Sequence, residues 1–286
     1  MTTITTALTE AKQAVDAIDA RVLLQHVLKV DRAYLIAHSH ETFTPDVIER
    51  YEQLVARRAT GEPIAYIIGQ REFYGLTFKV TPAVLIPRPE TELLVEQALV
   101  RLSEHSPTRV LDLGTGSGAI AIAIARHRPQ ASIVAVDRSP EALAIARENA
   151  DILLRDRASA IDFRISDWFS ALDAERFDVI VSNPPYVADN DPHLSQGDLR
   201  FEPKLALAAG PRGLDFLAHI AREAAPRLAP GGWLLLEHGY DQRDACLALM
   251  GENGYVEIAC SADIANIPRV TVGQRRNNPL SVHTNL

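Results

Sequence analysis

The first part of the chain, from Thr5 to about Ala59, has apolar residues spaced three and four positions apart. Examples are Val22, Leu23, Val27 and Leu28, and later Val47, Tyr51, Leu54 and Val55. This spacing places apolar side chains on one face of an α-helix. Thr44 followed by Pro45 is typical of the first residues of a helix. The pattern predicts a small helical bundle.

The pattern changes after residue 70. Between Arg71 and Thr81 apolar and polar residues alternate around Gly75, as expected for a β-hairpin. From about Pro89 onward short apolar runs alternate with helical patterns, which favours a parallel sheet covered by helices on both faces. We therefore expect an N-terminal helical domain at residues 1–70, a hairpin linker at 71–88 and an α/β domain at 89–286. A ligand would bind at the carboxyl ends of the strands.

Proline and glycine predict element boundaries in the α/β domain. Ser139-Pro140-Glu141 is typical of a helix start, and Pro230-Gly231-Gly232 of a helix end before a strand at Trp233–Glu237. A loop as long as residues 187–212 is uncommon inside a compact domain. We interpret it as a structureless segment that walls a substrate pocket, and we expect the last ten residues to be frayed.

Composition and charge exclude several classes of protein. The 286 residues are 47% hydrophobic, enough for a sizeable core, but no apolar run is long enough to span a bilayer. No secretion signal is visible, and Cys246 and Cys260 form no close pair, so we expect reduced thiols and a cytoplasmic protein. No spacing of His with Cys or acids predicts a metal site. The net charge of −8 argues against a nucleic-acid substrate and favours a protein partner.

A glycine loop is the first candidate binding site. Gly114, Gly116 and Gly118 follow a short apolar run and lead into a helix predicted at 117–126. Glycine lets a backbone approach a ligand closely, and a helix N-terminus offers free N–H groups. Together with Ala119, the first two glycines also satisfy the dinucleotide fingerprint. Both S-adenosylmethionine and a dinucleotide are therefore candidate ligands.

Four residues near this loop bear on the ligand. Asp112 could approach the amino-acid half of S-adenosylmethionine, whereas it would repel a pair of phosphates. Asp137, after the predicted strand Ser132–Val136, would accept both ribose hydroxyls of either ligand. Asp167 and Trp168 follow a further strand and would supply an acceptor and an aromatic neighbour for an adenine.

The apolar run Phe177–Val181 leads to the turn Asn183-Pro184-Pro185-Tyr186. The Asn183 oxygen and a main-chain carbonyl of the turn would each accept one N–H bond from a planar nitrogen, and so aim that nitrogen at an incoming methyl group. The prolines stiffen the turn, and Tyr186 can stack on a flat substrate group. Such a turn has no role in hydride transfer, so it favours S-adenosylmethionine. A glutamine amide and the exocyclic amine of adenine both fit this geometry.

Other polar residues are interpreted as structural. Glu237 and His238 end a predicted strand and look like an acid–base pair, but we expect them to serve the sheet end. Arg88 lies between two prolines and Glu90 follows the second. Both could face the pocket or cap the helix that begins there, and we favour a cap for Glu90.

The whole set of motifs resembles the PrmC/HemK family of peptide chain release factor N5-glutamine methyltransferases, over about Asp19–Arg275. Besides the glycine loop and the Asn183–Tyr186 turn, the resemblance is carried by Gly61-Glu-Pro-Ile-Ala-Tyr-Ile-Ile-Gly69, Arg71-Glu-Phe-Tyr-Gly75, Ile86-Pro-Arg-Pro-Glu-Thr-Glu92 and Phe201-Glu202-Pro203. It implies a class I methyltransferase fold, which is Rossmann-like with a mostly parallel seven-stranded sheet, and an N-terminal domain that recognises the substrate. The chain departs from the family at Ile264–Arg269 and in its tail, Asn277–Leu286, away from the chemistry.

The resemblance also implies the reaction and its residues. The methyl donor would be S-adenosylmethionine, with S-adenosylhomocysteine as product, and the acceptor would be the glutamine of the Gly-Gly-Gln motif in class-1 release factors. The enzyme would act as a monomer without direct contact to nucleic acid or membrane, and without a general base. The donor-binding residues would be Gly114, Thr115, Gly116, Ser117, Gly118, Asp137, Trp168 and Asn183. The substrate would be held by Asn183, Pro184, Pro185 and Tyr186, with Asn183 and Pro184 as the catalytic pair.

Overall fold

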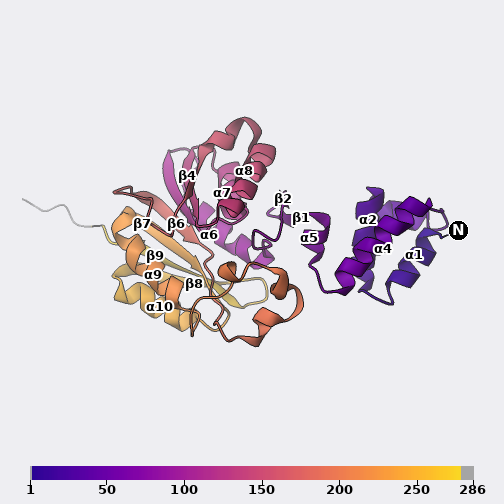
Figure 1. Cartoon of the computed structure of the whole chain (residues 1–286). Coiled ribbons are helices and arrows are strands. Elements are labelled where there is room, and N and C mark those ends of the chain that lie inside the picture. Colours follow the sequence, from indigo (N-terminus) through magenta and orange to yellow (C-terminus); the bar gives the residue numbers. More distant parts are fainter. Residues whose placement is uncertain (1, 278–286) are drawn as a thin grey trace, which may run out of the picture. The chain divides into compact units, whose positions relative to one another are not determined.

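The computed structural model describes residues 2–277, and the chain divides into two compact units (Figure 1). The first unit consists of Met1–Gln70 together with Ser195–Phe201, and the second of Arg71–Leu194 together with Glu202–Leu286. The chain therefore passes between the units after residues 70, 194 and 201. The predicted fraying concerns the last ten residues, and 278–286 among them lie outside the described residues.

The first unit is a helical bundle, as predicted. Its helices are α1 (Ile4–Ala11), α2 (Ala17–Leu28), α3 (Arg32–Ala37), α4 (Pro45–Ala59) and α5 (Ile64–Ile68). Their apolar faces form one core around Leu23 and Tyr51, and the buried Tyr51 hydroxyl donates to the Ala20 carbonyl at 3.0 Å. Thr44 is the N-cap of α4 and Pro45 its first residue, so the predicted helix start is confirmed.

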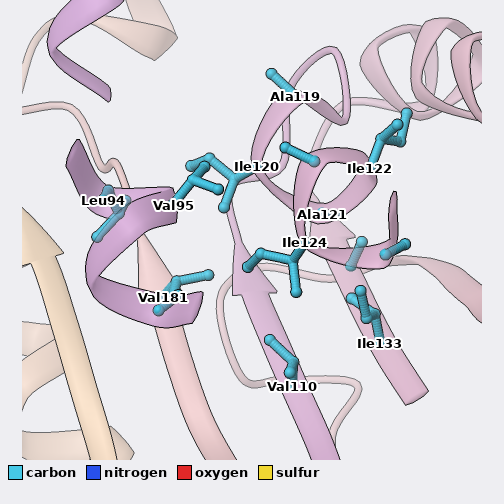
Figure 2. Packing of buried hydrophobic residues seen from close by; sticks show 14 of the residues in the cluster. Leu94, Val95, Val110, Ala119, Ile120, Ala121, Ile122, Ile124, Ile133 and Val181 are labelled. Carbon is cyan, nitrogen blue, oxygen red and sulfur yellow. The ribbon is translucent and has the colours of Figure 1, made fainter. Parts of the chain in front are cut away.

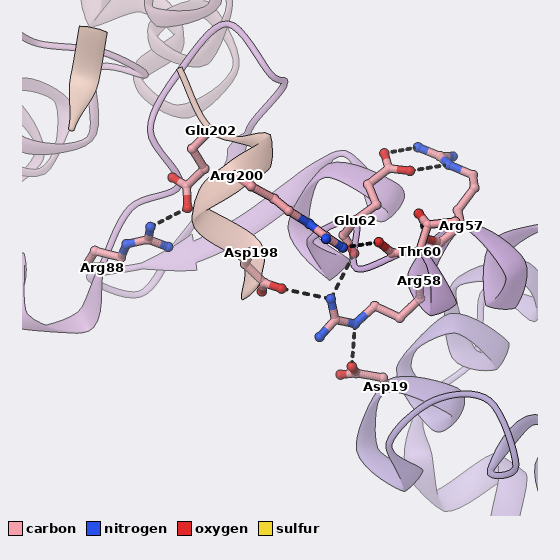
Figure 3. A network of polar contacts seen from close by, with 9 residues as sticks. All are labelled: Asp19, Arg57, Arg58, Thr60, Glu62, Arg88, Asp198, Arg200 and Glu202. Atoms are coloured by element: carbon pink, nitrogen blue, oxygen red, sulfur yellow. Dashed lines mark hydrogen bonds and ion pairs between the residues drawn. The ribbon is translucent and has the colours of Figure 1, made fainter. Parts of the chain in front are cut away.

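The inserted segment of the first unit forms a 3₁₀-helix, η4 (Gly197–Phe201). Asp198 accepts a hydrogen bond from Nη1 of Arg58 at 2.8 Å, and the Arg200 guanidinium donates to the Thr60 carbonyl (Figure 3). Charge-assisted bonds of this kind are stronger than neutral ones. A piece of the loop that follows the Asn183 turn is therefore held by α4 and the turn after it.

The second unit begins with a hairpin, β1 (Gln70–Phe73) and β2 (Leu76–Lys79), where the sequence predicted one. Its main sheet consists of β3 (Thr108–Leu113), β4 (Ala131–Asp137), β5 (Ile161–Ile165), β6 (Phe177–Ser182), β7 (Leu228–Glu237), β8 (Tyr255–Ala262) and β9 (Pro268–Arg275). The order is β5-β4-β3-β6-β7-β9-β8, with the pairs of β9 antiparallel and the others parallel. The predicted mostly parallel seven-stranded sheet is confirmed. The order reverses at β3, between β4 and β6, where open α/β sheets bind ligands.

Helices cover both faces of this sheet (Figure 1). They are α6 (Glu92–Arg101), α7 (Ala119–His127), α8 (Pro140–Leu154), α9 (Asp215–Ala224) and α10 (Arg243–Glu252), with the short 3₁₀-helices η1 (Pro89–Thr91), η2 (Arg155–Ala160) and η6 (Ala225–Arg227). Each face of the sheet has its own hydrophobic core, and alternate residues of β3 belong to different cores. Val110 packs with α6, α7 and α8, whereas Leu111 packs with α9 and α10. This alternation follows from the two-residue period of a strand.

The core beneath α7 explains how the glycine loop is supported. Every residue of α7 from Ala119 to Ala125 is buried. In Figure 2, Ile120 and Ile124 of this helix point toward α6 and the strand residue Val110. The small alanines of the helix leave room for close packing, so the loop preceding α7 rests on a dense layer of apolar side chains.

Two predictions about the second unit are wrong. The segment 187–212 is not structureless: it contains η3 (Pro192–Ser195), η4 and η5 (Lys204–Ala206), and Val187 forms a bridge with Ala208. Pro230–Gly232 does not end a helix, because α9 already ends at Ala224 and these residues lie within β7, whose pairing with β6 shifts register there. Glycine and proline are compatible with such an irregular strand position.

Candidate active site

The glycine loop is shaped by backbone conformations that favour glycine. Gly114, Gly116 and Gly118 have φ values of +72°, +55° and +82°. A Cβ at Gly118 would lie 3.0 Å from Cδ1 of Ile122 and 3.2 Å from Cβ of Ala146, so a larger residue would also be crowded. At Gly116 an added Cβ would meet nothing within 4 Å, which means that it would occupy open space beside the loop. Glycines at these positions therefore keep the space beside the loop open for a ligand.

Asp137 holds this loop in place. Its Oδ2 accepts a hydrogen bond from the Gly116 N–H at 2.9 Å, and its Oδ1 accepts one from the Ser139 N–H at 2.9 Å. Ser139 in turn caps α8, since its hydroxyl accepts from the Ala142 N–H. Each carboxylate oxygen can accept more than one bond. Asp137 therefore keeps capacity to accept from ligand hydroxyls while it fixes the loop.

Behind the loop, Asp112 is fully buried and accepts a hydrogen bond from the Thr115 hydroxyl at 2.6 Å. Burial raises the pKa of Asp112 to about 7. Asp112 does not line the cavity described below, so any action on a ligand would pass through Thr115 or the loop backbone. Thr115 and Ser117 are themselves buried.

Asn149 is a support of the loop that sequence reasoning missed. This buried residue of α8 donates from Nδ2 to the carbonyls of Ser117 at 2.9 Å and Lys79 at 3.0 Å, and its Oδ1 accepts from the Lys79 N–H at 2.8 Å. One side chain thereby joins the hairpin, the glycine loop and α8. An asparagine inside a helical pattern gives no sequence signal for such a role, because its partners lie 32 and 70 residues away.

A cavity opens above the carboxyl ends of β3, β4, β5 and β6. Among its lining residues are five of the predicted donor-binding residues: Gly114, Gly116, Asp137, Trp168 and Asn183. Asp167 and Pro185 also line it, whereas Thr115, Ser117, Gly118, Pro184 and Tyr186 do not. The remaining walls come from Ala83–Leu85, Ser139, Ala142, Pro203, Leu205, Ala206 and Phe216, among others. Residues from distant parts of the second unit thus meet at one site.

Trp168 presents an aromatic wall to this cavity. Its ring centroid lies 5.1 Å from that of Phe216, a residue of α9 that the sequence did not indicate. The backbone of Trp168 has φ +50°, uncommon for a bulky residue. The Ser166 hydroxyl donates to the Trp168 carbonyl at 2.8 Å and accepts from the Ala171 N–H at 3.0 Å, which holds this tight turn. The strained conformation lies at the candidate site, as backbone outliers often do.

The Asn183 turn lies next to the glycine loop because β6 pairs with β3. The buried Ser182 hydroxyl donates to the Leu113 carbonyl at 2.8 Å and joins the two strand ends. Nδ2 of Asn183 donates to the Thr91 hydroxyl at 3.1 Å. At the other end of the turn, the side chain of Gln242 donates to the Tyr186 carbonyl at 2.9 Å. The turn is therefore fixed at both ends.

Below the turn lies a buried acid. The Tyr186 hydroxyl donates to Oε1 of Glu237 at 3.4 Å. Burial raises the pKa of Glu237 to about 7, while Thr91, Arg269 and Tyr186 lower it. Burial also raises the pKa of Tyr186, so its hydroxyl stays protonated and can donate. His238 is a structural residue, as expected: it is fully buried, and Nε2 lies 2.9 Å from the Thr271 hydroxyl.

The loop after the turn is anchored again where it re-enters the second unit. Glu202 is buried, and its carboxylate accepts a hydrogen bond from the Arg88 guanidinium (Figure 3). It also accepts one from the Ile86 N–H at 3.1 Å. A buried carboxylate of this kind is tolerated only when it is paired. This anchor positions the neighbouring residues Pro203 and Leu205 in the cavity wall.

Comparison with known proteins matches both parts of the chain. A family model described as the PrmC N-terminal domain matches residues 1–69, and the methyltransferase small domain matches residues 89–198. The release factor glutamine methyltransferase of Xylella fastidiosa is 50% identical over 267 residues, which are 93% of this chain and 96% of that protein. This chain belongs to the release factor glutamine methyltransferase family. Its relative of that name in Escherichia coli is 46% identical over 90% of this chain and 91% of that protein.

A solved methyltransferase from Pyrococcus furiosus shares the fold with a TM-score of 0.53 at 18% identity, covering 77% of this chain and 97% of that chain. Membership of the family makes the chain an S-adenosylmethionine-dependent methyltransferase, and it decides against the dinucleotide oxidoreductase that the glycine loop left open. Within residues 2–277, no helix is both long and apolar enough to cross a membrane.

Proposed function

We propose that this enzyme transfers a methyl group from S-adenosylmethionine to the side-chain nitrogen, N5, of the glutamine in the Gly-Gly-Gln motif of class-1 peptide chain release factors. The observation that carries the proposal is the meeting of Asn183 with the glycine loop and Asp137 in one cavity. A hydrogen-bond acceptor for a planar nitrogen thereby lies beside a cradle for a nucleoside-like ligand. The names of the curated relatives support the choice of a protein glutamine over a nucleobase.

The residues around the cavity fit S-adenosylmethionine. Gly114 and Gly116 leave space that a Cβ would fill, Asp137 can accept ribose hydroxyls, and Trp168 with Phe216 offers an apolar neighbour for adenine. We assign the donor site to the residues Gly114, Thr115, Gly116, Ser117, Gly118, Asp137, Trp168 and Asn183. When bound, S-adenosylmethionine supplies a methyl group on a positively charged sulfur, and S-adenosylhomocysteine is its product.

The Asn183 turn orients the acceptor amide. Oδ1 of Asn183 and the carbonyl of Pro184 accept no hydrogen bond from any described residue, so both can accept an N–H of the glutamine. These two bonds fix the plane of the amide and aim its nitrogen at the methyl carbon. Pro185 stiffens the turn, and Tyr186 bounds the acceptor site. The nitrogen forms the new N–C bond and then releases its proton to water, so no side chain has to act as a base.

The remaining assignments concern partners. We propose that the helical unit at residues 1–70 recognises the release factor, and that the enzyme acts as a cytoplasmic monomer without direct contact to nucleic acid. The net charge of −8 supports a protein partner with a basic surface. It disfavours a nucleic-acid adenine N6-methyltransferase, which would need clustered positive charge.

Incubation with methyl-labelled S-adenosylmethionine tests this proposal. A class-1 release factor should take up label, and a mass spectrum should place one methyl group on the glutamine of its Gly-Gly-Gln motif. A release factor with that glutamine replaced by alanine and a duplex DNA serve as controls and should stay unlabelled. Label on the DNA instead of the release factor would establish the adenine methyltransferase.

Asp137→Ala should weaken donor binding by about 10- to 100-fold, because it removes charge-assisted hydrogen bonds to the ligand and to the Gly116 N–H. Isothermal titration calorimetry with S-adenosylmethionine measures this effect. Asp151→Ala removes an exposed carboxylate from α8 and should leave the Kd unchanged. A normal donor affinity in Asp137→Ala would remove this residue from the donor site.

A further inference from the structure

The amide of Asn183 has two ends that are similar in shape and opposite in hydrogen bonding. Oδ1 accepts and Nδ2 donates. The proposed capture of a glutamine N–H therefore works in only one of the two orientations of the Asn183 amide. In the flipped orientation the Nδ2 hydrogens of Asn183 would face the N–H groups of the substrate glutamine, and the glutamine nitrogen would be repelled. The two orientations have nearly the same shape, so a neighbouring hydrogen-bonding side chain has to select one.

Thr91 is the direct partner of this amide. It ends η1, just before α6, and is almost completely buried, with 4% of its surface exposed. Nδ2 of Asn183 donates to its hydroxyl oxygen at 3.1 Å. A threonine hydroxyl can also donate. Thr91 by itself would therefore accept either orientation of Asn183, and the choice depends on where the hydroxyl hydrogen points.

Glu237 determines where the hydroxyl hydrogen of Thr91 points. It is the last residue of β7 and is only 1% exposed. The Thr91 hydroxyl lies close enough to lower the pKa of the Glu237 carboxyl, although Oε2 of Glu237 has no hydrogen-bond partner of ordinary geometry among the described residues. Arg269 and the two hydroxyls of Thr91 and Tyr186 favour the ionised form of Glu237, and in that form the carboxylate only accepts. A buried carboxylate oxygen without a partner draws the hydroxyl hydrogen of Thr91 toward itself, which leaves the lone pairs of Thr91 for Asn183.

The other groups around Glu237 are consistent with this polarity. The Tyr186 hydroxyl donates to Oε1 at 3.4 Å, and Arg269 favours the ionised carboxylate, whereas burial and Glu90 oppose it. Two residues of the Asn183–Tyr186 turn are thus linked to one buried acid, Asn183 through Thr91 and Tyr186 directly.

We propose that Thr91 and Glu237 are positioning residues that hold the Asn183 amide with Oδ1 toward the acceptor glutamine. The proposal rests on the proposed function, since it concerns the same acceptor amide. Neither residue touches a reacting atom. Glu237 orients the Thr91 hydroxyl, Thr91 accepts from Nδ2, and Asn183 is left with its acceptor facing the substrate.

Three variants of the full chain test this. Thr91→Val keeps the shape but cannot accept, and Thr91→Ser keeps the hydroxyl. Glu237→Gln keeps the shape and introduces an N–H₂ that can donate to Thr91, which would let the threonine hydroxyl donate to Oδ1 of a flipped Asn183. Thr271→Val is the matched control, because it removes another buried hydroxyl from the same sheet, one bonded to His238.

Thr91→Val and Glu237→Gln should each lower kcat for a release factor by about 10- to 100-fold, the range caused by small misplacements of an orienting group. The Kd for S-adenosylmethionine should stay within about twofold of wild type. Thr91→Ser should restore most of kcat, and Thr271→Val should keep it. The double variant Thr91→Val, Glu237→Gln should be no slower than the slower single variant, because both act through one interaction.

A kcat of Thr91→Val within about twofold of wild type would overturn the proposal. So would equal losses in Thr91→Val and Thr91→Ser, since packing and not the hydroxyl would then matter. As a readout that does not need turnover, the side-chain N–H₂ resonances of Asn183 should shift in Thr91→Val and Glu237→Gln but not in Thr271→Val. If the wild-type enzyme leaves release factors unmodified, the proposed function fails, whereas normal turnover of the variants beside an active wild type defeats only the positioning role.

Discussion

Asn183→Ala should lower kcat for release factor methylation by about a hundredfold or more, because in the proposed mechanism Asn183 supplies one of two acceptors that orient a weakly nucleophilic amide nitrogen. The loss in kcat should far exceed any change in the Kd for S-adenosylmethionine. Asn183 lines the cavity, but most of its other walls come from residues that the substitution leaves in place. Single-turnover kinetics with a saturating release factor, together with calorimetry for the donor, separate the two quantities.

Asn253→Ala is the matched control for this experiment. Asn253 ends α10 and donates to the Leu249 carbonyl at 2.8 Å, away from the cavity lining. Its replacement should leave kcat unchanged. Methylation by Asn183→Ala at the wild-type rate would show that the acceptor amide is oriented by other groups, and the mechanism described above would be wrong.

Phe177→Ala should destabilise the second unit by about 3–5 kcal/mol, the usual cost of removing a fully buried aromatic side chain. Phe177 opens β6 with no exposed surface, and the Arg109 guanidinium lies 5.1 Å from the centre of its ring. The loss combines the transfer free energy of the ring with the cavity left behind. Because β6 ends in the Asn183 turn, the active site should lose its order in the same unfolding transition.

Urea unfolding followed by far-UV circular dichroism measures this free energy. Phe177→Leu fills most of the space and should cost clearly less than Phe177→Ala. Val100→Ala serves as a surface control, since Val100 is 79% exposed, and should change the free energy of unfolding by less than about 0.5 kcal/mol. Equal stability of Phe177→Ala and wild type would contradict the packing described for β6.

The parts of the site that the sequence revealed are local in the chain. The glycine loop follows β3 directly, and its positive φ values require residues without a Cβ, so composition and spacing were sufficient to find it. The same holds for Asn183–Tyr186, where prolines mark the turn, and for Asp137 at the end of β4. Each feature depends on neighbours within a few residues.

The parts that the sequence did not reveal depend on distant partners. Phe216 reaches the wall beside Trp168 from α9, and Asn149 bonds to a hairpin residue 70 positions away and to a loop residue 32 positions away. Segment 187–212 carries no periodic pattern, yet it is shaped by anchors such as Glu202 that bond to residues more than a hundred positions away. Periodicity reports which face of an element is buried, not which side chain it will meet.

The sequence by itself therefore determined the class of fold, the glycine loop and the Asn183–Tyr186 turn, because these follow from backbone geometry and short-range chemistry. Only the tertiary structure decided that Asn183 meets Thr91 and that Tyr186 meets Glu237, since η1, β6 and β7 bring these residues together from distant positions in the chain. Which partner donates and which accepts in a hydrogen bond depends on the neighbouring side chains and not on any single residue. This arrangement exists only once the sheet order has placed each donor opposite its acceptor.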